Sequence, residues 1–199
     1  MARRGLSDDP RAVRTHHALV DATVRMLEKQ GASDISVTAI VQEANVSRQV
    51  FYEHFADRDA VIYAAGKAVF KDPYEAFAAA VTEHGGITAD EELGEHVAAL
   101  FRALGERRET VSNLMNSPVR GLLNRFVINI MEEPIAADLF TRFEEHGTET
   151  SEANERNAAS TSRFLTAGMQ GVFNLAFQEE LAPEEVGKRL EEVRRTLLA

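Results

Sequence analysis

The chain has 199 residues, no cysteine and a formal net charge of −10. The lack of cysteine excludes disulfides and zinc–cysteine sites, and no stretch approaches the roughly 20 apolar residues of a membrane-spanning helix. No long apolar run follows the first arginines, so we expect no signal peptide and a cytoplasmic protein that does not contact a membrane.

The negative charge is unevenly distributed along the chain. Residues 1–63 hold eight basic and nine acidic side chains, a net charge of −1, and the remaining residues carry −9. Proteins that bind nucleic acid are usually basic. Any contact with DNA would therefore rest on local patches in the N-terminal third.

The first predicted elements are a tail and a helix. Residues 1–10 are expected to form a flexible tail, in which Arg3 and Arg4 either reach a groove or backbone of DNA or are simply solvated. From Arg11 to Gln30, apolar residues recur every three or four positions, which predicts an amphipathic helix that ends at Gly31.

Residues 36–55, SVTAIVQEANVSRQVFYEHF, predict two short helices joined by a tight turn. Ser36 and Ser47 are suitable N-caps. Asn45 tolerates the left-handed conformation that such a turn can require. Phe51 and Phe55 are four residues apart and would anchor the second helix.

The first turn of that second helix carries Arg48, Gln49 and Val50. This end of a recognition helix meets base edges in the major groove. Arginine pairs with guanine, glutamine with adenine, and a small apolar group can contact a thymine methyl. Tyr52 and His54 are donors that could bind phosphates. The residue types suit DNA binding, although short helix pairs occur in any helical protein.

The longer segment GAxxxSVTAIVQEANVSRQVFYEHFADRDAVI resembles the DNA-binding segment of the tetracycline-repressor (TetR) family of bacterial transcription regulators, over roughly residues 16–66. The matching positions are Gly31, Ser36 to Thr38, Ile40-Val41, Asn45-Val46-Ser47, Val50-Phe51-Tyr52, His54-Phe55 and Arg58-Asp59. The resemblance and the residue chemistry give these candidate DNA-binding residues: Ser36, Thr38, Ser47, Arg48, Gln49, Val50, Tyr52, His54 and Arg58.

Five positions depart from the family pattern. Arg58 stands for the family's Lys at the start of the fourth helix, where a cation can reach a phosphate. Asn45 stands for a usual Gly, which the turn can accept. Val37 and Val50 each replace a Thr, and Gln49 replaces a frequent Gly or Pro, so hydroxyl contacts are lost and a longer side chain enters the groove. These changes indicate a different operator sequence.

The resemblance implies an all-α fold in two domains. A three-helix helix-turn-helix DNA-binding domain would occupy residues 11–56, a linker helix 57–71, and a helical ligand-binding and dimerisation domain 72–199. It implies a homodimeric regulator of transcription, most often a repressor, that a small apolar or amphipathic ligand releases from a palindromic operator in double-stranded DNA.

Helical periodicity continues through the second domain. Asp57 should cap the linker helix, and Asp72-Pro73 should end or kink it. Further helices are predicted at 74–84, 89–107, 109–116, and from Ser117-Pro118 to His146 with a break or kink at Pro134. The polar segment 147–157 is expected to be an exposed loop. Helices should follow at 158–181 and from Pro183 onward.

The last two helices resemble those through which the family dimerises. Gly168 and Gly171 are costly in a helix and indicate close approach of another backbone. The candidate interface residues are Phe164, Gly168, Gly171, Val172, Leu175, Val186, Leu190, Val193 and Leu197. An internal helix hairpin of a monomer is the alternative.

The middle helices are rich in phenylalanine and methionine, which line apolar pockets but more often fill cores. The candidate ligand-binding residues are Phe77, Phe101, Met115, Asn116, Arg120, Phe126, Met131 and Phe173.

Signatures of catalysis are scarce. The chain has neither a glycine-rich phosphate loop nor an HExxH motif. Glu92 and His96, four apart, could share a helix face, but exposed helices often carry such pairs. We expect no catalytic residue, no metal and no cofactor, and therefore no enzyme. The alternative is a ligand-sensing or enzymatic helical protein that has lost operator binding, because Val37, Gln49 and Val50 differ from the family pattern.

Overall fold

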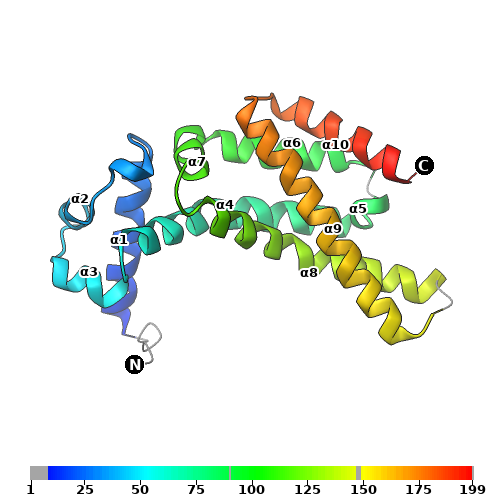
Figure 1. Ribbon diagram of the computed structural model, residues 1–199, viewed down its shortest axis with the longest axis horizontal. Coiled ribbons are helices and arrows are strands. Elements are labelled where there is room, and N and C mark those ends of the chain that lie inside the picture. Colours follow the sequence, from blue (N-terminus) through cyan, green and yellow to red (C-terminus); the bar gives the residue numbers. More distant parts are fainter. Residues whose placement is uncertain (1–8, 90, 147–148, 199) are drawn as a thin grey trace. The chain divides into compact units, whose positions relative to one another are not determined.

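The computed structural model describes residues 9–89, 91–146 and 149–198, and every regular element in these ranges is helical (Figure 1). The predicted all-α fold is confirmed. None of the described helices combines the length and apolarity that crossing a bilayer requires. The elements are α1 (Pro10–Leu27), the 3₁₀ helix η1 (Ala32–Asp34), α2 (Val37–Glu43), α3 (Arg48–His54), α4 (Arg58–Glu83), α5 (Gly86–Ala89), α6 (Leu93–Gly105), α7 (Arg108–Met115), α8 (Arg120–His146), α9 (Ser151–Gln178) and α10 (Pro183–Leu198).

The chain divides into two compact units. The head comprises the described residues up to Val69 together with Arg107–Leu123, and the body comprises Phe70–Glu106 together with the described residues from Asn124 onward. The first division, after Val69, falls inside α4. The association of Arg107–Leu123 with the head was not expected from chain order.

The head combines a capped first helix with a small apolar core. The Oδ1 atom of Asp9 accepts a hydrogen bond from the amide of Arg11 at 2.9 Å, and Pro10 occupies the first helical position, where a missing N–H costs little. The expected tail thus ends at Asp9, and its first eight residues lie outside the described ranges. The Nδ2 atom of Asn113 in α7 donates to the Leu27 carbonyl at 2.8 Å, which satisfies an acceptor at the end of α1.

Asp72-Pro73 was expected to end or kink the linker helix. It does not end the helix, because α4 runs through Pro73 to Glu83. A proline inside a helix costs about 3 kcal/mol through a lost hydrogen bond and a steric clash. Tyr74, Phe77 and Val81 are all buried on the far side of Pro73. Their burial, worth about 1.5–3 kcal/mol for each large apolar side chain, offsets the cost.

The same reasoning applies to α8, which begins at Arg120 and not at Ser117-Pro118 and is not broken at Pro134. Ile135 and Leu139 follow the proline and are each 4% exposed. The helix continues past Pro134 because these side chains belong to the core of the body.

The prediction of an exposed loop at residues 147–157 is wrong from Ser151 onward, because α9 begins there. Residues 147 and 148 lie outside the described ranges. The Thr150 hydroxyl accepts from the amide of Ala153 at 3.4 Å and caps the helix. The buried Asn154 donates to Glu144 Oε1 at 2.7 Å. The polar residues from Thr150 to Asn157 therefore form the first turns of α9, which side-chain hydrogen bonds stabilise.

The body has an aromatic core around the fully buried Phe173 of α9. Its ring centroid lies 5.3 Å from that of Phe101, 6.1 Å from Phe77 and 6.5 Å from Tyr74. The Tyr74 hydroxyl donates to Gln170 Oε1 at 3.3 Å. Burial raises the pKa of Tyr74, so this group stays a neutral donor.

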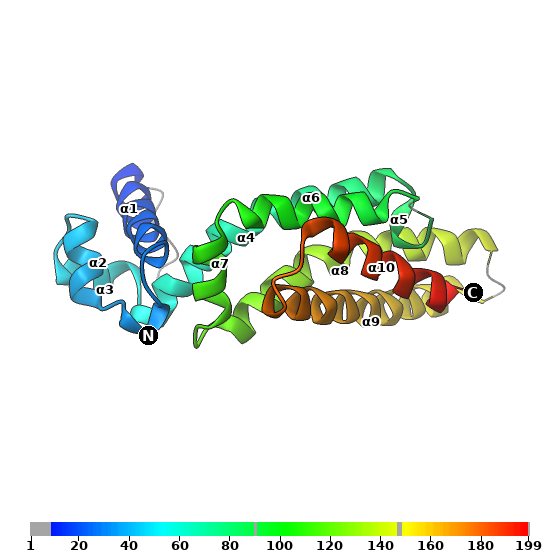
Figure 2. The ribbon, with the colours of Figure 1, turned by 90° about the horizontal axis from the view of Figure 1, so that it is seen from above.

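The helix α10 packs closely along α6 at a glycine–glycine crossing (Figure 2). A Cβ at Gly94 would lie 3.4 Å from the carbonyl oxygen of Gly187, and a Cβ at Gly187 would overlap the carbonyl oxygen of Gly94. By contrast, a Cβ at Gly168 or Gly171 would meet nothing within 4 Å. The close backbone approach expected at Gly168 and Gly171 is therefore absent within the described chain.

Candidate nucleic-acid interface

Two serine caps start the helices of the helix-turn-helix. The Ser36 hydroxyl accepts from the amide of Ala39 at 3.2 Å, and the Ser47 hydroxyl accepts from the amide of Val50 at 3.2 Å. Both serines are exposed. A capping hydroxyl uses a lone pair, so each O–H remains able to donate to a phosphate oxygen.

The turn between α2 and α3 depends on Asn45. Its φ of 54° lies in the left-handed region, as the sequence predicts. The Asn45 amide donates to the Gln42 carbonyl at 3.1 Å, and the Val46 amide donates to the Val41 carbonyl at 2.9 Å. These two bonds form a Schellman motif, which ends α2 and turns the chain into the cap of α3.

Two phenylalanines anchor α3 in the head. Phe51 is 0% exposed and Phe55 is 6% exposed, and their ring centroids are 5.9 Å apart. Their burial fixes which side of this short helix faces the core. The remaining side chains of α3 therefore have a defined direction.

Arg48, Gln49 and Tyr52 lie on the exposed side of α3. Arg48 Nη1 donates to Thr38 Oγ1 at 3.4 Å, and Gln49 Nε2 lies 3.5 Å from Glu53 Oε1. Among the described residues, no carboxylate forms an ion pair with Arg48. These weak contacts leave the guanidinium and the amide free to rearrange onto base edges.

The other predicted contacts differ in exposure. Thr38 is exposed, whereas Val50 and His54 are half-buried. His54 lies near His16, with ring centroids 6.0 Å apart. Val50 therefore offers a small apolar edge, and His54 offers a donor only at the border of the exposed surface.

Arg58, predicted to contact DNA, makes several hydrogen bonds within the head. Its Nε and Nη2 atoms donate to Asp59 Oδ1 at 3.0 Å, and Nη1 donates to the Ser33 carbonyl at 3.2 Å. Its side chain is 33% exposed. Arg58 thus ties the start of α4 to η1. The predicted cap of α4 is confirmed, since Asp57 Oδ1 accepts from the Ala60 amide at 2.8 Å.

His16 of α1 packs against Phe55, the residue that follows the last turn of α3. Its ring stacks on Phe55 at 4.7 Å between centroids, and its Nδ1 atom is buried without a hydrogen-bond partner. Burial, followed by repulsion from His54, His17 and Lys67, lowers the pKa of His16 below 6.5. A neutral His16 therefore fits this apolar contact.

The predicted interface residues divide into exposed and buried groups. Phe164, Leu175 and Val193 are 69%, 48% and 42% exposed, large values for apolar side chains. Val186 and Leu190 are 0% and 4% exposed, so both are buried within the single chain. The side chain of Leu197 lies outside the described residues.

The predicted ligand residues are divided between the two units of the chain. Met115, Asn116 and Arg120 belong to the head, whereas Phe77, Phe101, Phe126, Met131 and Phe173 belong to the body. Phe77, Phe101, Met131 and Phe173 are buried core residues, at most 5% exposed. None of the eight lines either cavity described below.

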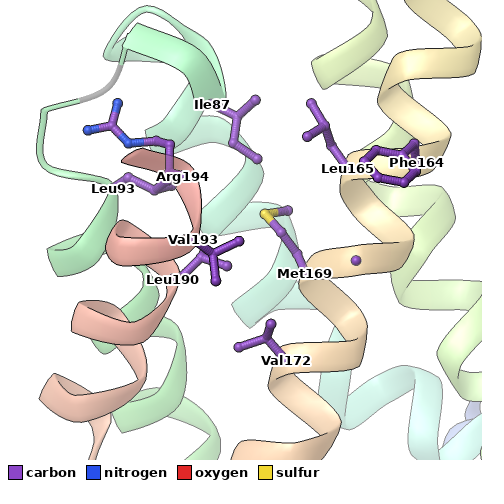
Figure 3. A pocket seen from close by; sticks show the side chains of 10 residues that line it. Ile87, Leu93, Phe164, Leu165, Met169, Val172, Leu190, Val193 and Arg194 are labelled. Atoms are coloured by element: carbon purple, nitrogen blue, oxygen red, sulfur yellow. The ribbon is translucent and has the colours of Figure 1, made fainter. Parts of the chain in front are cut away.

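The body holds an apolar cavity of about 250 Å³ between α9 and α10 (Figure 3). Leu165, Met169 and Val172 of α9 face Leu190 and Val193 of α10 across it. A second, more open cavity of about 520 Å³ adjoins it and shares Val172 and Val193. Leu165 and Met169 were not among the predicted ligand residues, although the apolar stripe of α9 at spacings of three and four contains both.

Comparison with known proteins supports the interpretation of the head. The sequence model described as "Bacterial regulatory proteins, tetR family" matches residues 19–65. A segment of 60 residues is 32% identical to the HTH-type transcriptional regulator BetI of Burkholderia thailandensis. It covers 30% of this chain and 31% of BetI, so the chain spans about a third of the length of that relative.

Two solved structures share the fold along most of the chain. The dihydroxyacetone kinase operon activator DhaS has a TM-score of 0.56 at 14% identity and covers 92% of this chain and 96% of its own. The TetR family repressor AlkX of Dietzia sp., implicated in biodegradation of n-alkanes, has a TM-score of 0.55 at 18% identity and covers 91% and 96%. The capped helix-turn-helix and the family match over residues 19–65 together show that this segment is a DNA-binding segment of the tetR-family type.

Proposed function

We propose that the exposed first turn of α3 reads base edges of a near-palindromic operator in double-stranded DNA. The observation that carries this proposal is the arrangement of α3: Phe51 and Phe55 are buried, while Arg48 and Gln49 project on the opposite side with only weak contacts. A recognition helix uses this end in the major groove. Val50 supplies an apolar edge for a thymine methyl.

The surrounding donors would bind the phosphate backbone and set the register of the head. These are the hydroxyls of Ser36, Thr38, Ser47 and Tyr52, the ring of His54 and the guanidinium of Arg58. Tyr52 is 53% exposed, so its hydroxyl is accessible. Arg58 is the least free of the set, because Asp59 and the Ser33 carbonyl already hold it. Its donors would therefore be shared between the head and a phosphate.

A homodimer would present two heads to the two operator half-sites. The support is the apolar surface of α9 and α10, where Phe164, Leu175 and Val193 are exposed beside two apolar cavities. Monomeric soluble proteins rarely expose large contiguous apolar patches. Gly168 and Gly171 on the same helix leave room for a close backbone approach by the second copy.

The regulator would act in the cytoplasm as a repressor, and an apolar or amphipathic ligand in the body would release it from DNA. The structural neighbours include both an activator and a repressor, so the fold itself does not fix the sign of regulation. The ligand would act only through its differential affinity for the DNA-bound and released states. The rival assignment is a helical sensor or enzyme that no longer binds an operator.

The test is selection of bound sequences from a random duplex library with purified protein at near-physiological salt. Enrichment of a palindrome is the expected result, with half-sites about one helical turn or a multiple apart. Folded, dimeric protein that enriches no sequence would overturn the operator proposal and favour the rival assignment. Transcription from a promoter that overlaps the selected site then reports the sign.

A further inference from the structure

Three metal-ligand side chains meet in the body, where α4 ends and α6 begins. His84 follows the last residue of α4, Glu92 is the N-cap residue of α6, and His96 lies one turn into α6. One ligand atom from each of them lies within 4.8 Å of the other two. Sequence spacing alone identifies Glu92 and His96, and the fold adds His84 to them.

The helix geometry holds Glu92 and His96 on one side of α6. The His96 amide donates to the Glu92 carbonyl at 3.0 Å, which makes the pair neighbours on successive turns. Although Glu92 is the N-cap residue, its side chain makes no capping hydrogen bond. The carboxylate is thus directed to the cluster and not to the amides of α6.

The hydrogen bond of His84 orients its second nitrogen. His84 Nδ1 lies 2.8 Å from the Ala80 carbonyl oxygen. A carbonyl only accepts, so Nδ1 carries the proton, and in the neutral ring Nε2 carries the lone pair. That Nε2 atom lies 3.9 Å from Glu92 Oε2. A ring N–H donated to a backbone carbonyl is the usual support of a metal-binding histidine.

The second imidazole lies close to the first. The ring centroids of His84 and His96 are 4.6 Å apart, with the planes tilted by 55°. Two imidazoles and a carboxylate brought this close together offer nitrogen and oxygen ligands to a single cation. A cation placed among them would be bound by all three.

We propose that His84, Glu92 and His96 bind one divalent first-row transition-metal ion, with Zn²⁺ as the best fit. Two imidazole nitrogens and a carboxylate oxygen are typical zinc ligands, and three protein ligands leave a fourth position for water. Imidazole favours zinc and its first-row neighbours over calcium and magnesium, which prefer oxygen ligands.

The distances allow such a site to close. Tetrahedral ligands at about 2.1 Å from zinc are about 3.4 Å apart. The separations in the structure reach at most 4.8 Å, so the ligand atoms need to approach by at most about 1.4 Å. His84 and Glu92 are exposed, and rotation of their side chains supplies this movement. A bound ion would fasten the end of α4 to the start of α6.

The test is titration of metal-free full-length protein with Zn²⁺ in competition with a chromogenic chelator. One ion per chain is expected. Single variants His84→Gln, Glu92→Gln and His96→Gln should each weaken binding by more than the roughly 10–100-fold typical of losing an outer-shell partner. His146→Gln, an exposed histidine at the end of α8, should change nothing. Circular dichroism verifies that each variant is folded.

The head contains another group of histidines, so His16→Gln is the second control and should also bind Zn²⁺ like the wild type. Titration with Co²⁺ adds a spectroscopic readout, since its visible bands report ligation by imidazole and carboxylate. No uptake by the wild type, or equal uptake by the wild type and His96→Gln, would overturn the proposal. No DNA is present in this experiment, so its result is independent of operator binding.

Discussion

His16 makes the stability of the head depend on pH, because its ring is part of the packing and can bind a proton. The ring stacks on Phe55, which anchors α3, and its lowered pKa keeps it neutral in the folded head. Sequence position alone suggests a surface histidine, because stacking on a residue 39 positions further along the chain is a tertiary contact. By contrast, the caps Ser36, Ser47 and Asp57 could be predicted, since capping depends on residues two or three positions away.

We predict that acidification destabilises the head through His16. Above pH 6.5, His16 is neutral in both the folded and unfolded states, so its contribution is fully present. As the pH falls through 6.5 toward the lower folded pKa, the unfolded state binds a proton first and stability is lost.

The variant His16→Phe keeps the stacking and removes the proton site. Melting temperatures of the wild type and His16→Phe, measured from about pH 8 to about pH 5.5, should diverge only on the acid side, with the variant declining less. Parallel melting curves across this range would contradict the assignment.

At the scale of helices, local signals predicted the start of α10 but not the starts of α8 and α9. Pro183 and the acidic residues after it mark the start of α10 as expected. Pro73 and Pro134 did not end their helices, because burial of neighbouring side chains outweighs a local breaker. The crossing of Gly94 and Gly187 could not be predicted, since its two halves lie 93 positions apart on different helices.

The glycine crossing gives a prediction about the stability of the body. Gly187→Ala should destabilise the protein by about 1–3 kcal/mol, because the added methyl group overlaps the Gly94 carbonyl and forces α6 and α10 apart. Gly105→Ala, at the end of α6 with nothing within 4 Å of the new Cβ, is the matched control. It should be neutral or stabilising by up to about 1 kcal/mol. Equal effects of the two substitutions in denaturant unfolding would show that the crossing is not tight.

Across the body, the type of an apolar residue did not predict whether its side chain fills the core or lines a cavity. Phe77, Phe101 and Phe173 were candidates for a ligand pocket and are packed core, whereas the cavity is lined by Leu165 and Met169. Periodicity identifies the inward side of a helix, but it does not show whether the facing helix is in contact or separated. The spacing between α9 and α10 is therefore information that only the fold supplies.

The exposed surface of α9 and α10 predicts the effect of a charge on assembly. Phe164→Asp should convert the proposed homodimer to monomer at micromolar concentration, because a carboxylate buried in an apolar contact without a partner is strongly disfavoured. Leu122→Asp is the matched control, since Leu122 is 53% exposed and lies in the head. Sedimentation velocity measures the result. A wild-type monomer, or an intact Phe164→Asp dimer, would contradict the proposed interface.

Base reading by the exposed first turn of α3 can be tested at Gln49. Sequence selection from one random duplex library should be run with the wild type, Gln49→Ala and Gln42→Ala, whose glutamine is exposed on α2 outside the recognition helix. We predict that Gln49→Ala relaxes the preference at one base-pair position in each half-site, by about 1–3 kcal/mol, while Gln42→Ala selects the wild-type sequence. Identical selected sequences for all three proteins would contradict base reading by Gln49.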